Sequence, residues 1–326
     1  MHMRPLGAAG PTIAEVGLGC WQFGGDFGDM TEDTAMAIMA ASVDRGVNFF
    51  DTADVYGAGR SETLIGRFLP GCAATVTVAT KFGRGGDIFP ANYSHDVLRR
   101  ATEASLTRLG VDCLDLLQLH CIPIESLRAG DVFDGLRQLQ SEGLIKAFGA
   151  SVESVEEGLL CMQQDGLLSL QVIFNIFRQK LVAELLPQAK AKGVGIIVRL
   201  PLASGLLSGK FTQDTTFVET DHRNYNRDGQ FFNVGETFAG LPFEKGVELT
   251  DAIKSLLPDG LTMAQLAQRW ILDHDAVSVI IPGASSPQQA QDNAAISDLP
   301  PLPTALHEKL SAFYTTHVHD HIRGPY

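Results

Sequence analysis

Short apolar runs alternate along this chain with longer segments of helical periodicity, and this alternation is the feature that most restricts its fold. Eight runs have the length of buried strands, at residues 16–19, 47–50, 74–80, 114–119, 145–150, 168–173, 194–198 and 277–281. The segments between them are typical of β/α units around a parallel sheet. The prediction is an α/β fold, a single (β/α)₈ TIM barrel domain spanning residues 1–326.

Helix-end signals accompany these units. Apolar residues after Thr31 recur at helical spacing up to Gly46, a residue that tolerates the left-handed backbone of a helix end. The segment from Ser94 stops in the same way at Gly110, and Ser154 opens a capping-box pattern. We therefore expect helices after these three positions.

The regular spacing fails once, in a long excursion at about residues 210–246. A loop of this length inside a compact domain is usually functional. The alternative is a surface excursion without a role.

Charge and cysteine usage exclude several classes of protein. A formal net charge of −13 disfavours nucleic acid or an anionic membrane as a partner, because both require concentrated Lys and Arg. No apolar run approaches the roughly 20 residues of a membrane span, and the first residues lack a secretory signal. Five scattered cysteines without a C-x-x-C pair indicate neither a disulfide framework nor a thiolate metal site. We expect a cytoplasmic protein, with a monomer favoured, that acts on a small molecule without a metal.

Polar residues with complementary chemistry follow the predicted strands. Asp51, Lys81 and His120 each come directly after an apolar run, and Tyr56 lies just beyond the first of these runs. Because active sites of parallel barrels lie at the carboxyl ends of the strands, the four side chains are expected to face one mouth. Such a set suits the delivery of a proton to a carbonyl oxygen while a hydride reaches the carbon.

Each of the four residues has an expected part in that chemistry. Lys81 is expected to lower the pKa of the Tyr56 phenol from its reference near 10, and Asp51 to hold the ammonium in place. His120 would hydrogen-bond the substrate oxygen and orient it. Taken singly, such residues are more often structural, so their order and spacing carry the prediction.

In these residues and their neighbours, the chain resembles the aldo-keto reductase family. The signature is residues 46–57, GVNFFDTADVYG, followed by Arg-Ser-Glu at 60–62. The resemblance continues through the segments 79–81, 114–120 and 281–283, and so covers nearly the whole chain. It is to bacterial-type members, related to the short-loop members that resemble potassium-channel β subunits.

The resemblance implies an enzyme that reduces aldehydes or ketones to alcohols with NAD(P)H. It implies a catalytic tetrad of Asp51, Tyr56, Lys81 and His120, with Tyr56 as general acid in reduction. It also implies a substrate pocket in which Trp21 lies beside Tyr56 and His120, and a nicotinamide cofactor extended across the barrel mouth.

Cofactor contacts carry over by position. Ser151 and Gln171 are similar to the pair that hydrogen-bonds the nicotinamide carboxamide, which fixes the ring for hydride transfer. Arg199 stands where many members carry a Tyr that stacks on that ring. Pro201 and Leu202, in the same segment as Arg199, are also expected to contact the cofactor. The resemblance assigns the pyrophosphate loop to residues 204–210, with Ser204, Gly205, Leu207 and Lys210 as contacts, and the adenosine end to Gly283, Ser285, Gln289 and Asn293.

The predicted adenosine end carries no cation, although a 2′-phosphate needs a charged partner. The prediction is NADP(H), with NAD(H) as the alternative. Arg223 and Arg227 of the excursion are expected to supply the missing charge by clasping the pyrophosphate or the 2′-phosphate. The competing interpretation is that both arginines are solvated or pair with nearby acids such as Asp221.

Two other functions stay open. The chain resembles potassium-channel β subunits closely enough to allow a cofactor-binding regulatory subunit with little turnover. The neutral adenosine end also allows an NAD-dependent sugar or polyol dehydrogenase, which keeps the chemistry and reverses its direction.

Overall fold

A parallel sheet of eight strands forms the centre of the computed structural model, which describes residues 1–326. The strands β3 to β10 pair in chain order, and the N–H groups of Gly17 and Gly19 donate to the carbonyls of Ile280 and Pro282, which closes the barrel. The strands are β1 Met3–Pro5, β2 Thr12–Ala14, β3 Leu18–Gly19, β4 Phe49–Asp51, β5 Thr77–Phe82, β6 Leu116–His120, β7 Phe148–Ser151, β8 Leu167–Ile173, β9 Gly195–Arg199 and β10 Val277–Ile280. The predicted (β/α)₈ barrel is confirmed.

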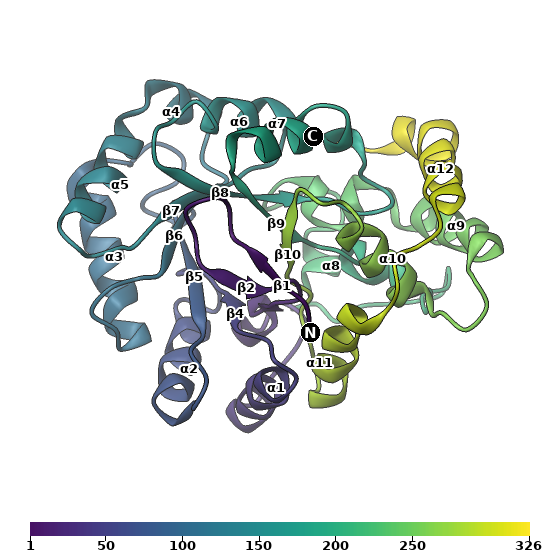
Figure 1. The fold of residues 1–326 in the computed structure, drawn as a ribbon, viewed down its shortest axis with the longest axis horizontal. Coiled ribbons are helices and arrows are strands. Elements are labelled where there is room, and N and C mark those ends of the chain that lie inside the picture. The colour runs from purple at the N-terminus through teal and green to yellow at the C-terminus, as the bar shows by residue number, and fades with distance from the viewer.

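Helices surround the strands (Figure 1). They are α1 Glu32–Asp44, α2 Arg60–Phe68, α3 His95–Leu109, α4 Ile124–Ala129, α5 Asp131–Ser141, α6 Val155–Cys161, α7 Leu185–Lys192, α8 His222–Tyr225, α9 Phe243–Ile253, α10 Met263–Leu272, α11 Pro287–Ala294 and α12 Thr304–Phe313. The capping box at Ser154 and the left-handed Gly110 at the end of α3 are confirmed. Thr31 likewise caps α1 by accepting a hydrogen bond from the N–H of Thr34.

The barrel interior is plugged by a hairpin that the sequence analysis did not anticipate. Strands β1 and β2 pair antiparallel and lie across the barrel in Figure 1. Leu6 and Ile13 of this hairpin belong to a buried cluster with Phe49, Leu116 and Ile197 of the barrel strands. The hairpin therefore excludes water from one end of the barrel and leaves the other end for a site.

The excursion at about residues 210–246 contains no strand, only α8 and the short 3₁₀ turns Val234–Glu236 and Phe238–Gly240 before α9 begins. It is tied to the barrel mouth. Ser204 Oγ donates to the carbonyl of Glu236 and accepts from the N–H of Phe238, at 3.1 and 3.2 Å. The N–H of His222 donates to the carbonyl of Asp26. These bonds hold the excursion over the carboxyl ends of the strands.

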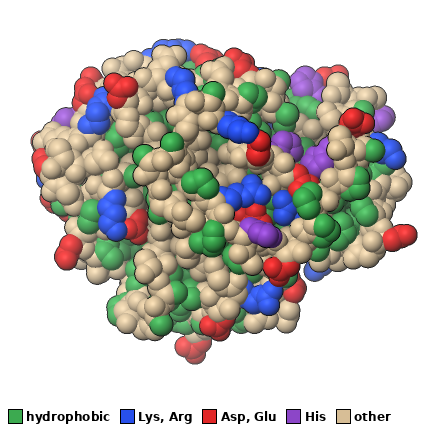
Figure 2. Space-filling view, viewed as in Figure 1, with side chains coloured by type: hydrophobic (Ala, Val, Ile, Leu, Met, Phe, Trp, Pro, Cys, Tyr) green, Lys and Arg blue, Asp and Glu red, His purple; other side chains and the backbone are tan.

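The surface in Figure 2 shows acidic and basic side chains interspersed rather than one basic patch. No helix in the fold has both the length and the apolar character that crossing a membrane requires.

Candidate active site

A cavity of about 590 Å³ opens at the carboxyl ends of the strands. This volume falls within the roughly 300–1,000 Å³ of ligand pockets. Most of the expected site residues line it: Trp21, Asp51, Tyr56, His120, Gln171, Arg199, Pro201, Leu202, Ser204, Gly205, Gly283, Ser285 and Gln289. Five others do not reach its wall: Lys81, Ser151, Leu207, Lys210 and Asn293.

Lys81 joins the acid and the phenol at the base of the cavity. Its Nζ donates to Asp51 Oδ1 at 2.5 Å, to the carbonyl of Thr52 at 2.7 Å and to the Tyr56 hydroxyl at 3.3 Å. The Lys81 and Asp51 side chains are only 1% and 3% exposed. Strands β4 and β5 are neighbours, which brings residues 30 positions apart into one buried ion pair.

The pKa of Tyr56 corrects one expectation. Burial raises the pKa of the phenol to about 12, although Lys81 acts in the opposite direction as predicted. The nearby charge of Asp51 adds to the increase. Burial also disfavours the charged Lys81, but the attraction of Asp51 and then of Tyr56 outweighs it and holds the pKa of Lys81 above its usual value. The phenol therefore keeps its proton at neutral pH.

His120 lies at the end of β6 with its ring centre 6.0 Å from that of Tyr56. Burial, and then the positive charges of Arg84, Lys81 and Arg199, hold the pKa of His120 well below its usual value. Its Nδ1 is buried without a hydrogen-bond partner. The imidazole is therefore neutral and can hydrogen-bond a neutral oxygen without competing for its proton.

Trp21 covers the phenol from the side of β3. The Trp21 and Tyr56 rings stack with centres 5.9 Å apart and planes 19° from parallel. Trp21 Nε1 donates to Asp26 at 2.9 Å, and the His222 ring packs against the indole at 4.6 Å. The indole is thus held as one wall of the reaction end, where the sequence had placed it.

Gln171 within β8 pairs in register with Ser151 at the end of β7, but their polar atoms are already engaged. Gln171 Nε2 donates to Asp51 Oδ2 at 2.6 Å, and Ser151 Oγ donates to Gln171 Oε1 at 3.5 Å. Gln171 lines the cavity, whereas Ser151 stands behind it. Gln171 can thus meet an amide ligand, while Ser151 supports it from behind.

The predicted phosphate loop divides into two parts. Ser204 and Gly205 line the cavity and both have positive φ, at 55° and 101°, so their backbone turns sharply beside the opening. Leu207 instead packs in the hydrophobic core, and Lys210 is solvent-exposed. Small side chains at the turn leave room for a ligand to approach the backbone.

At the adenosine end, Gln289 Oε1 accepts from both the N–H and the hydroxyl of Ser285. Asn293 Nδ2 donates to the carbonyl of Gly283 at 3.1 Å. Asn293 therefore holds the loop from behind, while the other three residues line the cavity.

The two arginines of the excursion behave differently. Arg223 lines the cavity beside the predicted phosphate loop, where a Cβ on Gly205 would lie 3.6 Å from its Nη1. Its guanidinium donates to Asp221 at 2.5 Å. Arg227 pairs with Glu244 and does not line the cavity. In this structure both arginines pair with acids, as the competing interpretation states.

A charged cluster that the sequence analysis did not identify lines the same cavity. Arg84 Nη2 lies 2.9 Å from Glu153 Oε1 and 2.5 Å from Glu236 Oε1. Asn233 Nδ2 donates to Glu153 Oε2 at 2.8 Å, and Arg199 Nη1 lies 3.5 Å from Glu236. Arg84 and Glu153 follow β5 and β7 closely, so the rule that polar residues after strands face the mouth could have found them.

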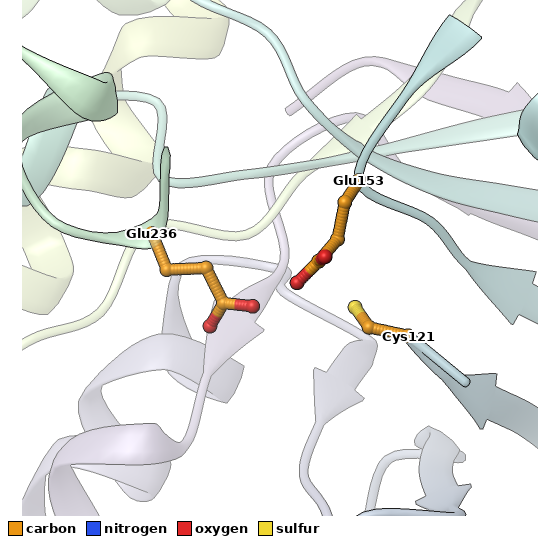
Figure 3. Close-up of side chains that lie close together, drawn as sticks. All are labelled: Cys121, Glu153 and Glu236. Atoms are coloured by element: carbon orange, nitrogen blue, oxygen red, sulfur yellow. The ribbon is translucent and has the colours of Figure 1, made fainter. Parts of the chain in front are cut away.

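Glu153 and Glu236 also converge with the Cys121 thiol (Figure 3). These are metal-ligand types, but Arg84 is bonded to both carboxylates. Burial raises the pKa of the Cys121 thiol to about 11, so it stays protonated. The geometry is that of an ion-pair cluster.

The two acids of the cluster have opposite pKa shifts. Burial, and then the charge of Glu236, raise the pKa of Glu153 to about 7. Burial acts on Glu236 in the same direction, but Arg84 and then Arg199 outweigh it and lower the pKa of Glu236 to about 2. One carboxylate is thus permanently charged and the other titrates near neutrality.

Comparison with known proteins identifies the family. A sequence model described as "Aldo/keto reductase family" matches residues 15–315. Aldo-keto reductase YhdN of Bacillus subtilis is 29% identical over 304 residues, 89% of this chain and 87% of that protein. A probable voltage-gated potassium channel subunit beta of Arabidopsis thaliana is 30% identical over 332 residues, 94% of each chain. The solved glycerol dehydrogenase AKR11B4 from Gluconobacter oxydans superposes with a TM-score of 0.80 at 27% identity, covering 99% of this chain and 98% of that one. The predicted enzyme class is confirmed: the chain belongs to the aldo/keto reductase family.

Proposed function

We propose that this enzyme reduces aldehydes or ketones to alcohols with NADP(H), and that Tyr56 delivers the proton. The observation that carries the proposal is the position of Lys81 Nζ between Asp51 and the Tyr56 hydroxyl at the base of the cavity. The bound nicotinamide would supply the hydride. The chain supplies the proton, the orientation of the carbonyl and the exclusion of water.

The proton transfer follows from the state of each group. Tyr56 is protonated at neutral pH, since its pKa is about 12, and is therefore a donor. As its proton leaves, the Lys81 ammonium at 3.3 Å stabilises the phenolate, and this interaction grows with the negative charge. Neutral His120 would hold the carbonyl oxygen next to the phenol.

The cavity lining fits a nicotinamide dinucleotide. The cavity extends from Trp21 and Tyr56 past Arg199 to the turn at Gly205 and the loop at Gly283. Arg199 lines the cavity between these two ends. NADP(H) is proposed ahead of NAD(H) because Arg223, the cation beside the phosphate loop, lines the cavity.

The test is the oxidation of reduced cofactor, followed by absorbance, with a reactive aldehyde such as 4-nitrobenzaldehyde. The proposal expects turnover that depends on both reactants, and a failure with every carbonyl and both cofactors would reject it. Separate fluorescence titrations with NADP and NAD compare their affinities.

A second candidate function uses the same site for the reverse reaction, in which a sugar or polyol is oxidised. The similarity to a glycerol dehydrogenase at 27% identity favours it. Comparing the oxidation of glycerol and aldoses with the reduction of aldehydes distinguishes the two directions.

A further inference from the structure

One wall of the cavity is built from charged and amide side chains that the proton-transfer chemistry does not use. We call Arg84, Glu153, Arg199, Asn233 and Glu236 the polar wall. All five line the cavity. Their side chains come from the ends of β5, β7 and β9 and from the excursion, so they surround the reaction end.

The polar wall lies close to the reacting groups. Strand β6, which ends in His120, pairs with β5 on one side and β7 on the other. Arg84 and Glu153 follow those two strands and thus flank His120. A substrate whose carbonyl meets Tyr56 and His120 therefore places its next carbons against this wall.

The charges of the wall balance when Glu153 is ionised, above its pKa of about 7. Arg84 and Arg199 provide two positive charges against Glu153 and Glu236. Behind the wall Arg178 donates to the backbone carbonyl of Glu153, and across the cavity Asp26 accepts from Trp21. These add one charge of each sign. A substrate with a net charge gains no overall attraction from such an arrangement.

The wall is rigid, yet it keeps unused hydrogen-bonding capacity. Arg84 donates to both oxygens of Glu236, at 2.5 and 3.1 Å, which fixes the two planes relative to each other. Arg199 is 12% exposed, its two contacts to oxygen are both 3.5 Å, and its Nε has no partner. Contacts of that length are weak, so Arg199 retains donors for a ligand oxygen.

An aromatic surface adjoins the wall. The Phe232 ring lies 6.1 Å from Trp21, and the Arg84 guanidinium lies 5.9 Å from Phe232. Both rings line the cavity. A ligand here meets apolar ring faces on one side and fixed donors and acceptors on the other.

We infer that the polar wall binds the hydroxyl groups of an uncharged polyhydroxylated carbonyl substrate, such as a short sugar, while its C–H faces contact Trp21 and Phe232. A hydroxyl both donates and accepts, so it can donate to Glu153 and accept from Arg199. A plain aldehyde offers no oxygen to the spare donors of Arg199, and sites built around substrate hydroxyls reject analogues that lack them. The inference rests on the proposed carbonyl reduction.

The test compares three aldehydes of four carbons: butanal, D-erythrose and succinic semialdehyde. They have no substituent, neutral hydroxyls and a carboxylate, respectively. The inference predicts that kcat/KM for erythrose exceeds that for each of the others by at least about a hundredfold. Equal or faster turnover of butanal would overturn it. A preference for succinic semialdehyde would overturn it in favour of an anion site.

A variant ties the preference to the wall. Glu153→Gln keeps the shape but removes one charged acceptor, and the ratio of kcat/KM for erythrose over butanal is expected to fall at least about tenfold. Glu156→Gln removes a carboxylate that pairs with Arg128 at the surface, and it should leave the ratio unchanged. An unchanged ratio in Glu153→Gln, with wild-type folding, would contradict the assignment.

A binding measurement separates this inference from the proposed function. Calorimetric titration of erythritol into the protein with oxidised cofactor needs no turnover. If no aldehyde is reduced but erythritol binds and Glu153→Gln weakens it, the proposed reaction fails and the polar wall stands. If aldehydes are reduced but erythritol does not bind, the polar wall assignment fails alone.

Discussion

The ammonium of Lys81 lies 2.5 Å from the carboxylate of Asp51, and neither side chain is more than 3% exposed. Gln171 and Gln118 also donate to this carboxylate, at 2.6 and 3.1 Å. The pair is therefore a buried charge centre directly below the Tyr56 hydroxyl. Its removal should affect both folding and catalysis.

Lys81→Met leaves Asp51 as a buried charge without its cation. We expect the free energy of unfolding to fall by about 3–5 kcal/mol, the usual cost of breaking a buried pair. Urea denaturation measures the change. Lys146→Met is the matched control, since Lys146 pairs with Asp115 but is 65% exposed, and such pairs contribute at most about 1 kcal/mol. Equal losses in the two variants would contradict the assignment.

Glu153 makes stability depend on pH near neutrality. Burial and Glu236 raise its pKa from 4.5 to about 7 in the folded protein, so the folded state holds a proton that the unfolded state releases. The contribution of Glu153 to the free energy of unfolding is fully present below pH 4.5 and is lost as the pH rises through 7. The loss is up to about 3 kcal/mol. The groups facing it are Arg84, Asn233, Glu236 and Arg178.

Denaturation of wild type and Glu153→Gln at pH 5, 6, 7 and 8 isolates this contribution. The variant should lose less stability across the range than the wild type. The pKa of Glu236 is shifted in the opposite direction, to about 2, so its contribution to stability is lost only in strong acid. Glu236 therefore stays charged from pH 5 to 8 and does not affect the comparison. Parallel pH profiles for both proteins would show that Glu153 ionises normally.

Arg223→Gln tests the phosphate clasp. If this cavity-lining cation meets a phosphate of the cofactor, NADP affinity should fall at least about tenfold, or about 1.4 kcal/mol. Loss for NADP alone indicates the 2′-phosphate, and equal loss for NAD indicates the pyrophosphate. Arg227→Gln, outside the cavity, is the control. Unchanged affinity for both cofactors in Arg223→Gln would reject the clasp.

The barrel, and the clustering of the four residues proposed as a tetrad, could be predicted because their signals are local. Each apolar run marks a strand, and Asp51, Lys81 and His120 lie at the ends of such runs. The hairpin β1–β2 was not predicted because its strands, Met-Arg-Pro and Thr-Ile-Ala, contain no apolar run.

Two features of the site could not be predicted because they depend on which residues meet in the folded chain. Glu236 lies 152 positions from Arg84 in a segment without periodicity, so their pairing could not be foreseen. The direction of the Tyr56 pKa shift was missed because a neighbouring cation is visible in a motif, whereas the stronger effect of burial is not.

The central claim is that Tyr56 donates the proton, and Tyr56→Phe tests it most directly. The substitution removes the hydroxyl and little volume, so the kcat for aldehyde reduction should fall by about 10²–10⁴, the usual contribution of a general acid. The Kd for the cofactor, measured by fluorescence titration of the same preparation, should stay within about twofold of wild type. A Tyr56→Phe variant that binds the cofactor normally and reduces aldehydes at the wild-type rate would contradict the account.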